Sequence, residues 1–178
     1  MRTVVSTEEA LARLEETIWP KIRNAHITHG QLDITCDPNN LLEVMETLRD
    51  DEKLSCKFFT FLSGVDRSTF ADNPGGLEVL IHVYSPEHVV HVTVHVPVDD
   101  AAPACPSISG LYAGALWHER ETYEMFGVVF AGHPNLVNLY LPEDFEGHPL
   151  LKSFKLPGRH VKEWPGAKDP EEAAAGGR

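Results

Sequence analysis

The chain has 178 residues, of which 15 are Lys or Arg and 27 are Asp or Glu, so its formal net charge is −12. With 42% hydrophobic and 24% charged residues, the composition is that of a globular protein rather than a disordered chain. The acidic balance argues against binding to nucleic acid or to an anionic membrane surface, because both interactions need clustered Lys and Arg.

The first predicted element is a helix that begins after Ser6 and ends before Pro20. Ser6 and Glu9 have the spacing of a capping box, in which each side chain binds the backbone N–H of the other residue. The helix presents one apolar face, formed by Leu11, Leu14 and Ile18.

A hairpin and a second helix follow. Residues 26–28 and 32–36 read as two short strands joined by a turn at 29–30. Asp37 is positioned to cap the second helix, with Pro38 at its first position. The expected apolar face of this helix consists of Leu41, Leu42, Met45 and Leu48.

Three further strands are predicted, over residues 57–62, 77–84 and 90–96, with a loop at 72–76. The first is rich in aromatic residues, and we expect it to be buried. The third alternates, with Val90, Val92, Val94 and Val96 on one face and His91, Thr93 and His95 on the other. This alternation predicts one face against a core and one face toward water or a partner.

The order of these elements predicts an α+β fold. We expect a two-layer sandwich, with a mostly antiparallel or mixed sheet of about five strands covered by helices. We find no run of about 18 apolar residues that would predict a membrane-spanning helix.

Composition divides the chain into two parts. Residues 127–178 are 52 of the 178 residues, yet they hold 6 of the 13 prolines and 7 of the 13 glycines. Because this density breaks helix and strand periodicity, we expect a folded domain over 1–126 and an extended partner-binding arm over 127–178. The arm's apolar residues are Phe130, Leu136, Val137, Leu139, Tyr140, Leu141, Phe145, Leu150, Leu151, Phe154, Leu156 and Trp164. Laid on a neighbour, they would supply an interface of about 2,000 Å² or more.

The chain shows no redox or nucleotide-binding motif. Its three cysteines, Cys36, Cys56 and Cys105, are widely spaced and form no C-x-x-C pair, which argues against an iron–sulfur or zinc ligand set and a disulfide framework. No glycine-rich dinucleotide or phosphate loop is present either.

Four histidines lie on or beside the last two strands, at His82, His88, His91 and His95. His91 and His95 share a strand face but are about 13 Å apart at about 3.3 Å per residue, too far to bind one zinc ion. His82 with one of them would place only two ligands, so we expect a polar or partner-facing sheet face and no metal site.

The most informative segment is 116–127, which reads Leu-Trp-His-Glu-Arg-Glu-Thr-Tyr-Glu-Met-Phe-Gly. It predicts a helix capped by Gly127, with a charged set beside an apolar stripe. Since a guanidinium in that position must reach water or carboxylates, we expect a partly shielded network of ion pairs. Its members would be Glu119, Arg120, Glu121 and Glu124.

This segment resembles the signature of the 30-kDa-type subunit of respiratory complex I, which is the C-type subunit of bacterial NADH:quinone oxidoreductase. The family pattern is Glu-Arg-Glu, two variable residues, an acidic residue, Leu or Met, an aromatic residue and Gly, followed by two further blocks. The matching residues here are Glu119, Arg120, Glu121, Glu124, Met125, Phe126, Gly127, Gly132, His133, Pro134, Phe145, Glu146, Gly147, His148, Pro149 and Leu150. After this point the family usually has Arg-Lys-Asp followed by an aromatic residue, whereas this chain has Leu151-Lys152-Ser153-Phe154. The positive charge at position 151 and the negative charge at position 153 are therefore missing.

The resemblance implies a non-catalytic structural subunit of a proton-translocating complex. Members of that family bind no cofactor or metal and have no catalytic residue. They lie in the peripheral arm on the cytoplasmic side of the membrane, against the D-type subunit with the quinone site and the B-type subunit with the terminal cluster. NADH, FMN, iron–sulfur clusters and quinone serve electron transfer in the whole complex, and the signature residues are expected at subunit interfaces.

Two alternatives remain open. The signature is also compatible with the equivalent subunit of a related membrane-bound hydrogenase complex. A stand-alone enzyme is the other alternative, with acid–base chemistry from Glu119 or Glu121 and from His118, His133 or His148. His133 and His148 both precede proline, which favours an extended backbone and a structural turn.

Overall fold

The computed structural model describes residues 4–71 and 75–156. Helix α1 (Thr7–Thr17) has the predicted capping box: Glu9 N donates to Ser6 Oγ at 3.2 Å, and Ser6 N donates to Glu9 Oε2 at 2.9 Å. Pro20 lies in the short 3₁₀ turn that follows the helix, η1 (Trp19–Lys21). The capping residues therefore fix the start of α1, as the sequence predicts.

Strands β1 (Ile22–Thr28) and β2 (Gln31–Cys36) form the predicted hairpin. Both turn residues have positive φ, 53° at His29 and 75° at Gly30, as a tight two-residue hairpin turn requires. The cap predicted for the next helix is wrong. A 3₁₀ turn, η2 (Pro38–Asn40), comes first, and Asp37 pairs with Arg23 rather than capping a backbone N–H.

The predicted cap places the first helical residue at Pro38, but helix α2 (Leu41–Asp50) starts three residues later. Its buried face also differs by one residue from the predicted face. Leu41, Met45 and Leu48 are buried as expected, but Leu42 is 41% exposed and Val44 lies in the core instead. Val44 is three residues after Leu41 and four before Leu48, so it completes the helical stripe that Leu42 interrupts.

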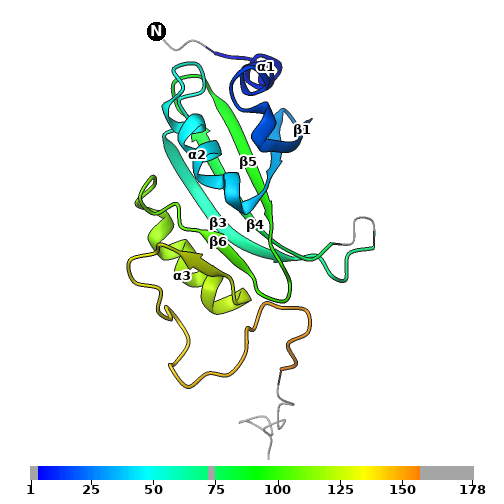
Figure 1. Cartoon of the computed structure of the whole chain (residues 1–178), viewed down its shortest axis with the longest axis vertical. Helices are drawn as coiled ribbons and strands as arrows, with labels where there is room; N and C mark the ends of the chain where they lie inside the picture. The colour runs from blue at the N-terminus through cyan, green and yellow to red at the C-terminus, as the bar shows by residue number, and fades with distance from the viewer. Residues whose placement is uncertain (1–3, 72–74, 157–178) are drawn as a thin grey trace, which may run out of the picture.

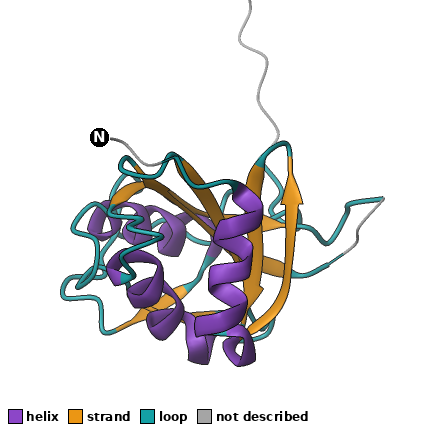
Figure 2. Cartoon of the chain, turned by 90° about the horizontal axis from the view of Figure 1, so that it is seen from above, coloured by secondary structure: helices purple, strands orange, loops and turns teal. Residues whose placement is uncertain are grey.

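A five-stranded mixed sheet confirms the predicted fold class. The remaining elements are β3 (Phe58–Asp66), β4 (Leu77–Ser85), β5 (Val90–Pro97), β6 (Ala104–Pro106), α3 (Ala115–Phe126) and β7 (Val129–Ala131). The strand order is β1-β2-β5-β4-β3, in which only β2 and β5 run parallel. Helices α1, α2 and α3 lie on one face of this sheet (Figures 1 and 2).

The alternation in β5 is confirmed, and it defines the two faces. Val90, Val92, Val94 and Val96 are buried in the core beneath the helices. The opposite face, which we call the open face, has no helix over it among the described residues. A chain of contacts between ionisable side chains crosses this face: Asp33 lies 3.7 Å from His26 and 3.8 Å from His95, and Glu78 lies 3.6 Å from His95 and 2.8 Å from Arg67.

The expectation that the aromatic start of β3 is buried is wrong for two of its residues. Phe58 and Phe61 are exposed, and Phe59 is half-buried. β3 is the last strand of the sheet, and its pairing with β4 shifts register between Phe59 and Phe61. This irregularity turns Phe61 onto the open face, where its ring stacks on His82 at 5.7 Å between centroids.

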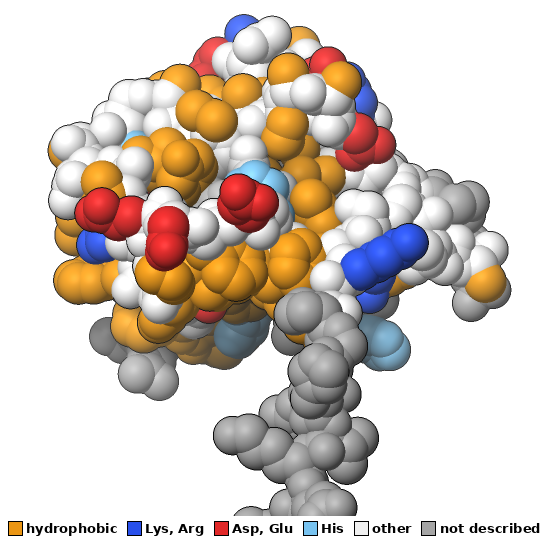
Figure 3. Space-filling view, turned by 90° about the horizontal axis from the view of Figure 1, so that it is seen from below, with side chains coloured by type: hydrophobic (Ala, Val, Ile, Leu, Met, Phe, Trp, Pro, Cys, Tyr) orange, Lys and Arg blue, Asp and Glu red, His pale blue; other side chains and the backbone are white. Residues whose placement is uncertain are grey.

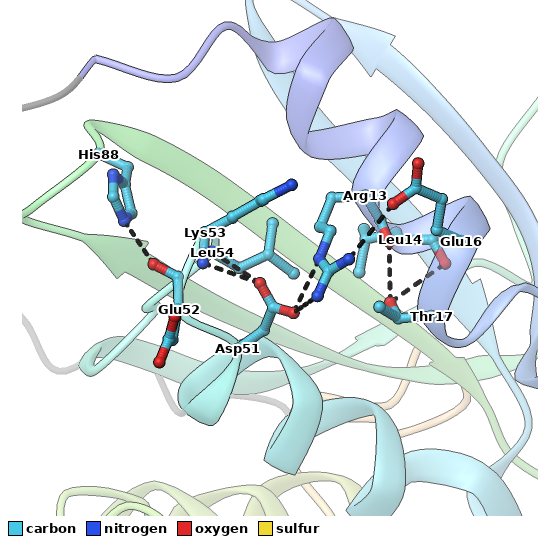
Figure 4. Close-up of polar contacts among 9 residues, drawn as sticks. All are labelled: Arg13, Leu14, Glu16, Thr17, Asp51, Glu52, Lys53, Leu54 and His88. Carbon is cyan, nitrogen blue, oxygen red and sulfur yellow. Dashed lines mark hydrogen bonds and ion pairs between the residues drawn. The ribbon is translucent and has the colours of Figure 1, made fainter.

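An ion pair fixes α1 to the loop after α2 (Figure 4). Arg13 Nη2 lies 2.7 Å from Asp51 Oδ2, and Asp51 Oδ1 accepts hydrogen bonds from the backbone N–H groups of Lys53 and Leu54. Burial opposes ionisation of Asp51, but these hydrogen bonds and the Arg13 charge outweigh it and lower the pKa of Asp51.

Part of the predicted arm contributes to the core. β7 pairs in parallel with β6, and this pairing leaves Phe130 only 2% exposed rather than available to a partner as expected. Val128 is also buried. The rest of the arm's partner-binding role remains a prediction, and residues 157–178, including Trp164, lie outside the described residues, as do residues 72–74 of the predicted loop. Within residues 4–71 and 75–156, no helix is long and apolar enough to cross a membrane.

Gly64 on β3 allows the end of α3 to approach the sheet, which gives a testable prediction. A Cβ atom at this position would lie 2.6 Å from the ring of Phe126. We expect Gly64→Ala to lower the free energy of unfolding by about 1–3 kcal/mol, because the buried ring has to shift. Urea denaturation measures this change. Gly110→Ala is the control, since its added Cβ meets no atom within 4 Å. Equal loss of stability in both variants would contradict the prediction.

Candidate functional site

The signature segment forms helix α3, and Gly127 ends it with a left-handed backbone. Gly127 has φ of 80°, and its N–H donates to the carbonyl of Tyr123 at 2.9 Å. A Cβ atom at this position would also lie 2.7 Å from Nε2 of His148. Glycine is therefore required at this position for two reasons: the left-handed helix cap and the close approach of the third signature block.

Glu119 is fully buried, and it binds the segment that precedes the helix. Its carboxylate accepts hydrogen bonds from Ser107 Oγ at 2.6 Å and from Ile108 N at 2.7 Å. Burial raises the pKa of Glu119 above its ordinary value, although these hydrogen bonds oppose the increase. Glu119 thus anchors residues 107–108 to α3.

His133 fixes the second signature block to the start of the same helix. Asn135 N donates to His133 Nδ1 at 3.0 Å, so the hydrogen of the ring lies on Nε2, which donates to the carbonyl of Leu116 at 3.1 Å. Nε2 is also 4.0 Å from Glu119 Oε2, and both side chains are buried. This carboxylate–histidine pair is enclosed by protein rather than open to a substrate.

Arg120 and Glu124 hold a segment that runs alongside α3, residues 137–141, which we call the strap. Arg120 donates from Nε to the carbonyl of Val137 at 2.9 Å and from Nη2 to the carbonyl of Asn138 at 2.8 Å. Glu124 is buried and accepts hydrogen bonds from the next three backbone N–H groups, those of Leu139, Tyr140 and Leu141. Two adjacent turns of the helix therefore bind five successive residues through their backbone atoms.

The predicted network of ion pairs is not formed. Among the described residues, no ion pair joins Arg120 to Glu119, Glu121 or Glu124, because Arg120 is directed to the strap and lies over the Trp117 ring at 5.3 Å. Burial disfavours the charged form of Glu124, but the three backbone N–H groups and the Arg120 charge together lower the pKa of Glu124.

Glu121 differs from its neighbours in the signature. It is half-buried, and its side chain makes no hydrogen bond or ion pair within the part of the chain that the structure describes. Trp117, one turn earlier on the helix, is 60% exposed. These two side chains are available to another molecule.

The third signature block folds back on the end of α3. His148 Nδ1 donates to the carbonyl of Glu124 at 2.9 Å, and Leu150 N donates to the carbonyl of Met125 at 3.1 Å. Phe145 packs on Phe154 at 6.0 Å between ring centroids. The structure thus brings the three blocks together around one helix.

The other predicted site residues are placed as follows. Phe126 is buried, Met125 and Pro149 are half-buried, and Pro134, Glu146 and Leu150 are exposed. Gly132 and Gly147 have φ of 87° and 88° and form turns. The sequence analysis missed residues 107–108 and the strap as partners of α3. These segments bind the helix through backbone atoms or a serine hydroxyl, and no sequence pattern predicts such contacts.

In the part of the chain that the structure describes, no group of three or more His, Cys, Asp or Glu residues could hold a metal ion. A cleft of about 420 Å³ lies between the body and the third block, lined in part by Asp66, Phe126 and His148. Asp66 is already engaged, because Ser68 N and Lys152 N both donate to its carboxylate.

The strap contacts predict a pH-dependent structure. Because the pKa of Glu124 lies below its ordinary value of 4.5, its stabilising effect is present above that value and is lost as the pH falls through the lowered pKa. We expect Glu124→Gln to release the strap at every pH. Losing charge-assisted hydrogen bonds worth about 1.5–3 kcal/mol would speed amide exchange at Leu139, Tyr140 and Leu141 about 10- to 100-fold.

Hydrogen exchange followed by NMR measures this effect. Glu121→Gln on the same helix is the matched control, since Glu121 has no partner among the described residues, and strap exchange should be unchanged in it. Wild-type exchange rates in Glu124→Gln would show that Glu124 does not hold the strap.

Comparison with known proteins identifies the family. The model of the family described as "Respiratory-chain NADH dehydrogenase, 30 Kd subunit" matches residues 34–160. The chain is 38% identical over 153 residues to the C-type subunit of NADH-quinone oxidoreductase from Mesorhizobium japonicum, covering 86% of this chain and 74% of that protein. It is 37% identical over 151 residues to the corresponding protein of a Roseiflexus species, covering 85% of each.

Two solved structures are similar as well. The trypsin-resistant fragment of Nqo5 superposes with a TM-score of 0.62 at 26% identity, over 71% of this chain and 98% of that one. A chain of the archaeal membrane-bound sulfane sulfur reductase has a TM-score of 0.66 over 84% of this chain and 85% of its own, but at 20% identity it shares the fold alone. The chain therefore belongs to the family of the 30 Kd subunit of respiratory-chain NADH dehydrogenase, which includes these two bacterial NADH-quinone oxidoreductase relatives.

Proposed function

We propose that this chain is a non-catalytic structural subunit in the peripheral arm of a proton-translocating NADH:quinone oxidoreductase. In this role it braces the D-type subunit with the quinone site and the B-type subunit with the terminal cluster, on the cytoplasmic side of the membrane. NADH, FMN, iron–sulfur clusters and quinone are bound by other subunits. Family membership supports the complex, and the surface around α3 supports the bracing role.

The observation that carries the proposal is the way α3 holds the strap. Since Arg120 and Glu124 bind only its backbone, the strap presents two exposed side chains for other contacts: Val137 is 48% exposed and Tyr140 is 65% exposed. Hydrophobic side chains gather over this end of the molecule (Figure 3). The exposed ones on α3 and after it are Trp117, Val129, Val137, Tyr140, Phe145, Leu150 and Leu156.

An apolar surface of this kind is typical of a protein that is assembled with partners. Tryptophan, tyrosine and arginine are the residues that contribute most to binding at protein interfaces. Here Arg120 lies over Trp117 on α3, and Tyr140 lies on the strap that Arg120 and Glu124 hold. Half-buried Glu121 beside Trp117 adds a charge that a basic group on a partner would pair with.

The arrangement of Glu119 and His133 argues against a stand-alone enzyme. A general base has to reach the proton that it removes. Here the carboxylate and the ring are buried, and their polar atoms are engaged by Ser107, Ile108 and Leu116. These groups hold the fold together, which leaves the family's structural role as the better explanation.

Affinity purification of the native full chain from solubilised membranes tests the proposal. We expect the D-type and B-type subunits to co-purify with it, together with other cluster-bearing and membrane subunits. Co-purifying hydrogenase subunits would favour the related hydrogenase complex instead. A partner-free protein with its own turnover would contradict both and favour the enzyme.

A matched pair of variants tests the interface. Glu121→Ala should fold normally but reduce the yield of assembled complex, because an interface contact worth about 1–2 kcal/mol changes partner affinity roughly 5- to 30-fold. Arg120→Ala should reduce it further, since it also releases the strap. Glu46→Ala on α2, an exposed residue on a different element, is the control. Normal assembly and normal quinone reductase activity in both test variants would exclude this surface as the interface.

A further inference from the structure

Two histidines lie side by side on the open face of the sheet, away from α3 and its strap. His82 on β4 and His91 on β5 are both half-buried, and His91 Nδ1 lies 3.4 Å from His82 Nε2. Stacking holds both rings: Phe61 stacks on His82, and the Tyr84 ring lies 4.4 Å from that of His91. The nitrogens that face each other therefore have fixed positions.

The hydrogen bonds of Thr60 determine which nitrogen of His82 carries the hydrogen. Thr60 Oγ1 donates its one hydrogen to the carbonyl of His82 at 2.6 Å. Toward His82 Nδ1, which it also contacts, the same oxygen can then only accept. The hydrogen of a neutral His82 ring is thus on Nδ1, and the lone pair of Nε2 is directed toward His91.

His95, the next histidine on β5, is not part of the pair, because its ring lies between Asp33 and Glu78 at 3.8 and 3.6 Å. Within the described residues, the pair therefore presents two imidazoles and no carboxylate.

This geometry fits a metal ion. Two nitrogens bound to a tetrahedral ion at about 2.0–2.1 Å lie about 3.3–3.4 Å apart, and the observed separation is 3.4 Å. A metal-binding histidine usually donates its other N–H to an oxygen that fixes the ring, which is what Thr60 provides for His82. Imidazole pairs suit Zn²⁺ and Cu²⁺ among the divalent ions.

We propose that His82 and His91 form a two-histidine binding site for a divalent transition-metal ion, with water in the remaining coordination positions. The proposal goes beyond the function proposed above and does not depend on it. The sequence alone predicts no metal site here, since His82 and one other histidine would supply only two ligands. The proposal revises that expectation, because the structure shows where the two side chains lie, which strand spacing alone does not. With two protein ligands, the site would bind and release its ion reversibly.

Titration of the purified, untagged full chain with CuCl₂ and with ZnCl₂ at pH 7.5, followed by calorimetry, tests this inference. We expect one ion bound per chain, and electron paramagnetic resonance of the Cu²⁺ form should report two nitrogen ligands. His82→Gln and His91→Gln should each weaken binding about tenfold or more, and Thr60→Val should weaken it less. Both glutamine variants keep a polar side chain on the open face, and circular dichroism checks their fold.

His26→Gln on β1 is the control for adventitious binding to an exposed histidine, and it should bind as the wild type does. Absence of one-to-one binding, or equal affinity in the wild type and both glutamine variants, would overturn the proposal. The pair would then be an imidazole–imidazole hydrogen bond, with His91 Nδ1–H donating to His82 Nε2. Because the isolated chain is used, this result leaves the assembly experiment unaffected.

Discussion

A carboxylate taken out of water is stable in a protein only if other donors replace its hydration shell, and helix α3 buries two carboxylates within six residues. Within the described residues, neither Glu119 nor Glu124 is paired with a lysine or arginine side chain at ion-pair distance. Glu119 takes its donors from residues 107–108 and Glu124 takes its donors from the strap. Satisfying these two groups brings the segments before and after the helix together, and the arrangement of this end of the molecule depends on it.

This requirement explains why charged residues of the signature lie inside the chain's own fold. A carboxylate with three backbone N–H donors is held more firmly than one in a surface ion pair, which contributes about 0–1 kcal/mol. The helix therefore acts as a rigid support, and the half-buried Glu121 and exposed Trp117 are presented from it in defined positions. The proposed bracing role would benefit from such a support, because ordering an interface during assembly reduces affinity.

Local patterns predicted most of the fold, and long-range contacts account for what they missed. The capping box at Ser6, the hairpin turn at 29–30 and the valines of β5 follow from neighbours in sequence. The exposure of Phe61 depends on a register shift at a sheet edge, and the partners of Glu124 lie 15–17 residues away. The three blocks of the motif gather on α3. The motif did not reveal the contacts among them, because backbone amides are present at every position.

The strap is recognised by its backbone, so the fold places few demands on which side chains it carries. Val137 and Tyr140 point outward from a segment whose shape is set elsewhere, by Arg120 and Glu124. Substitutions of the exposed Val137 and Tyr140 should therefore cost little stability, except for proline at position 140, which has no N–H to donate. In the proposed role, the outward surface of the strap is thereby free to diverge in evolution while the helix that supports it stays the same.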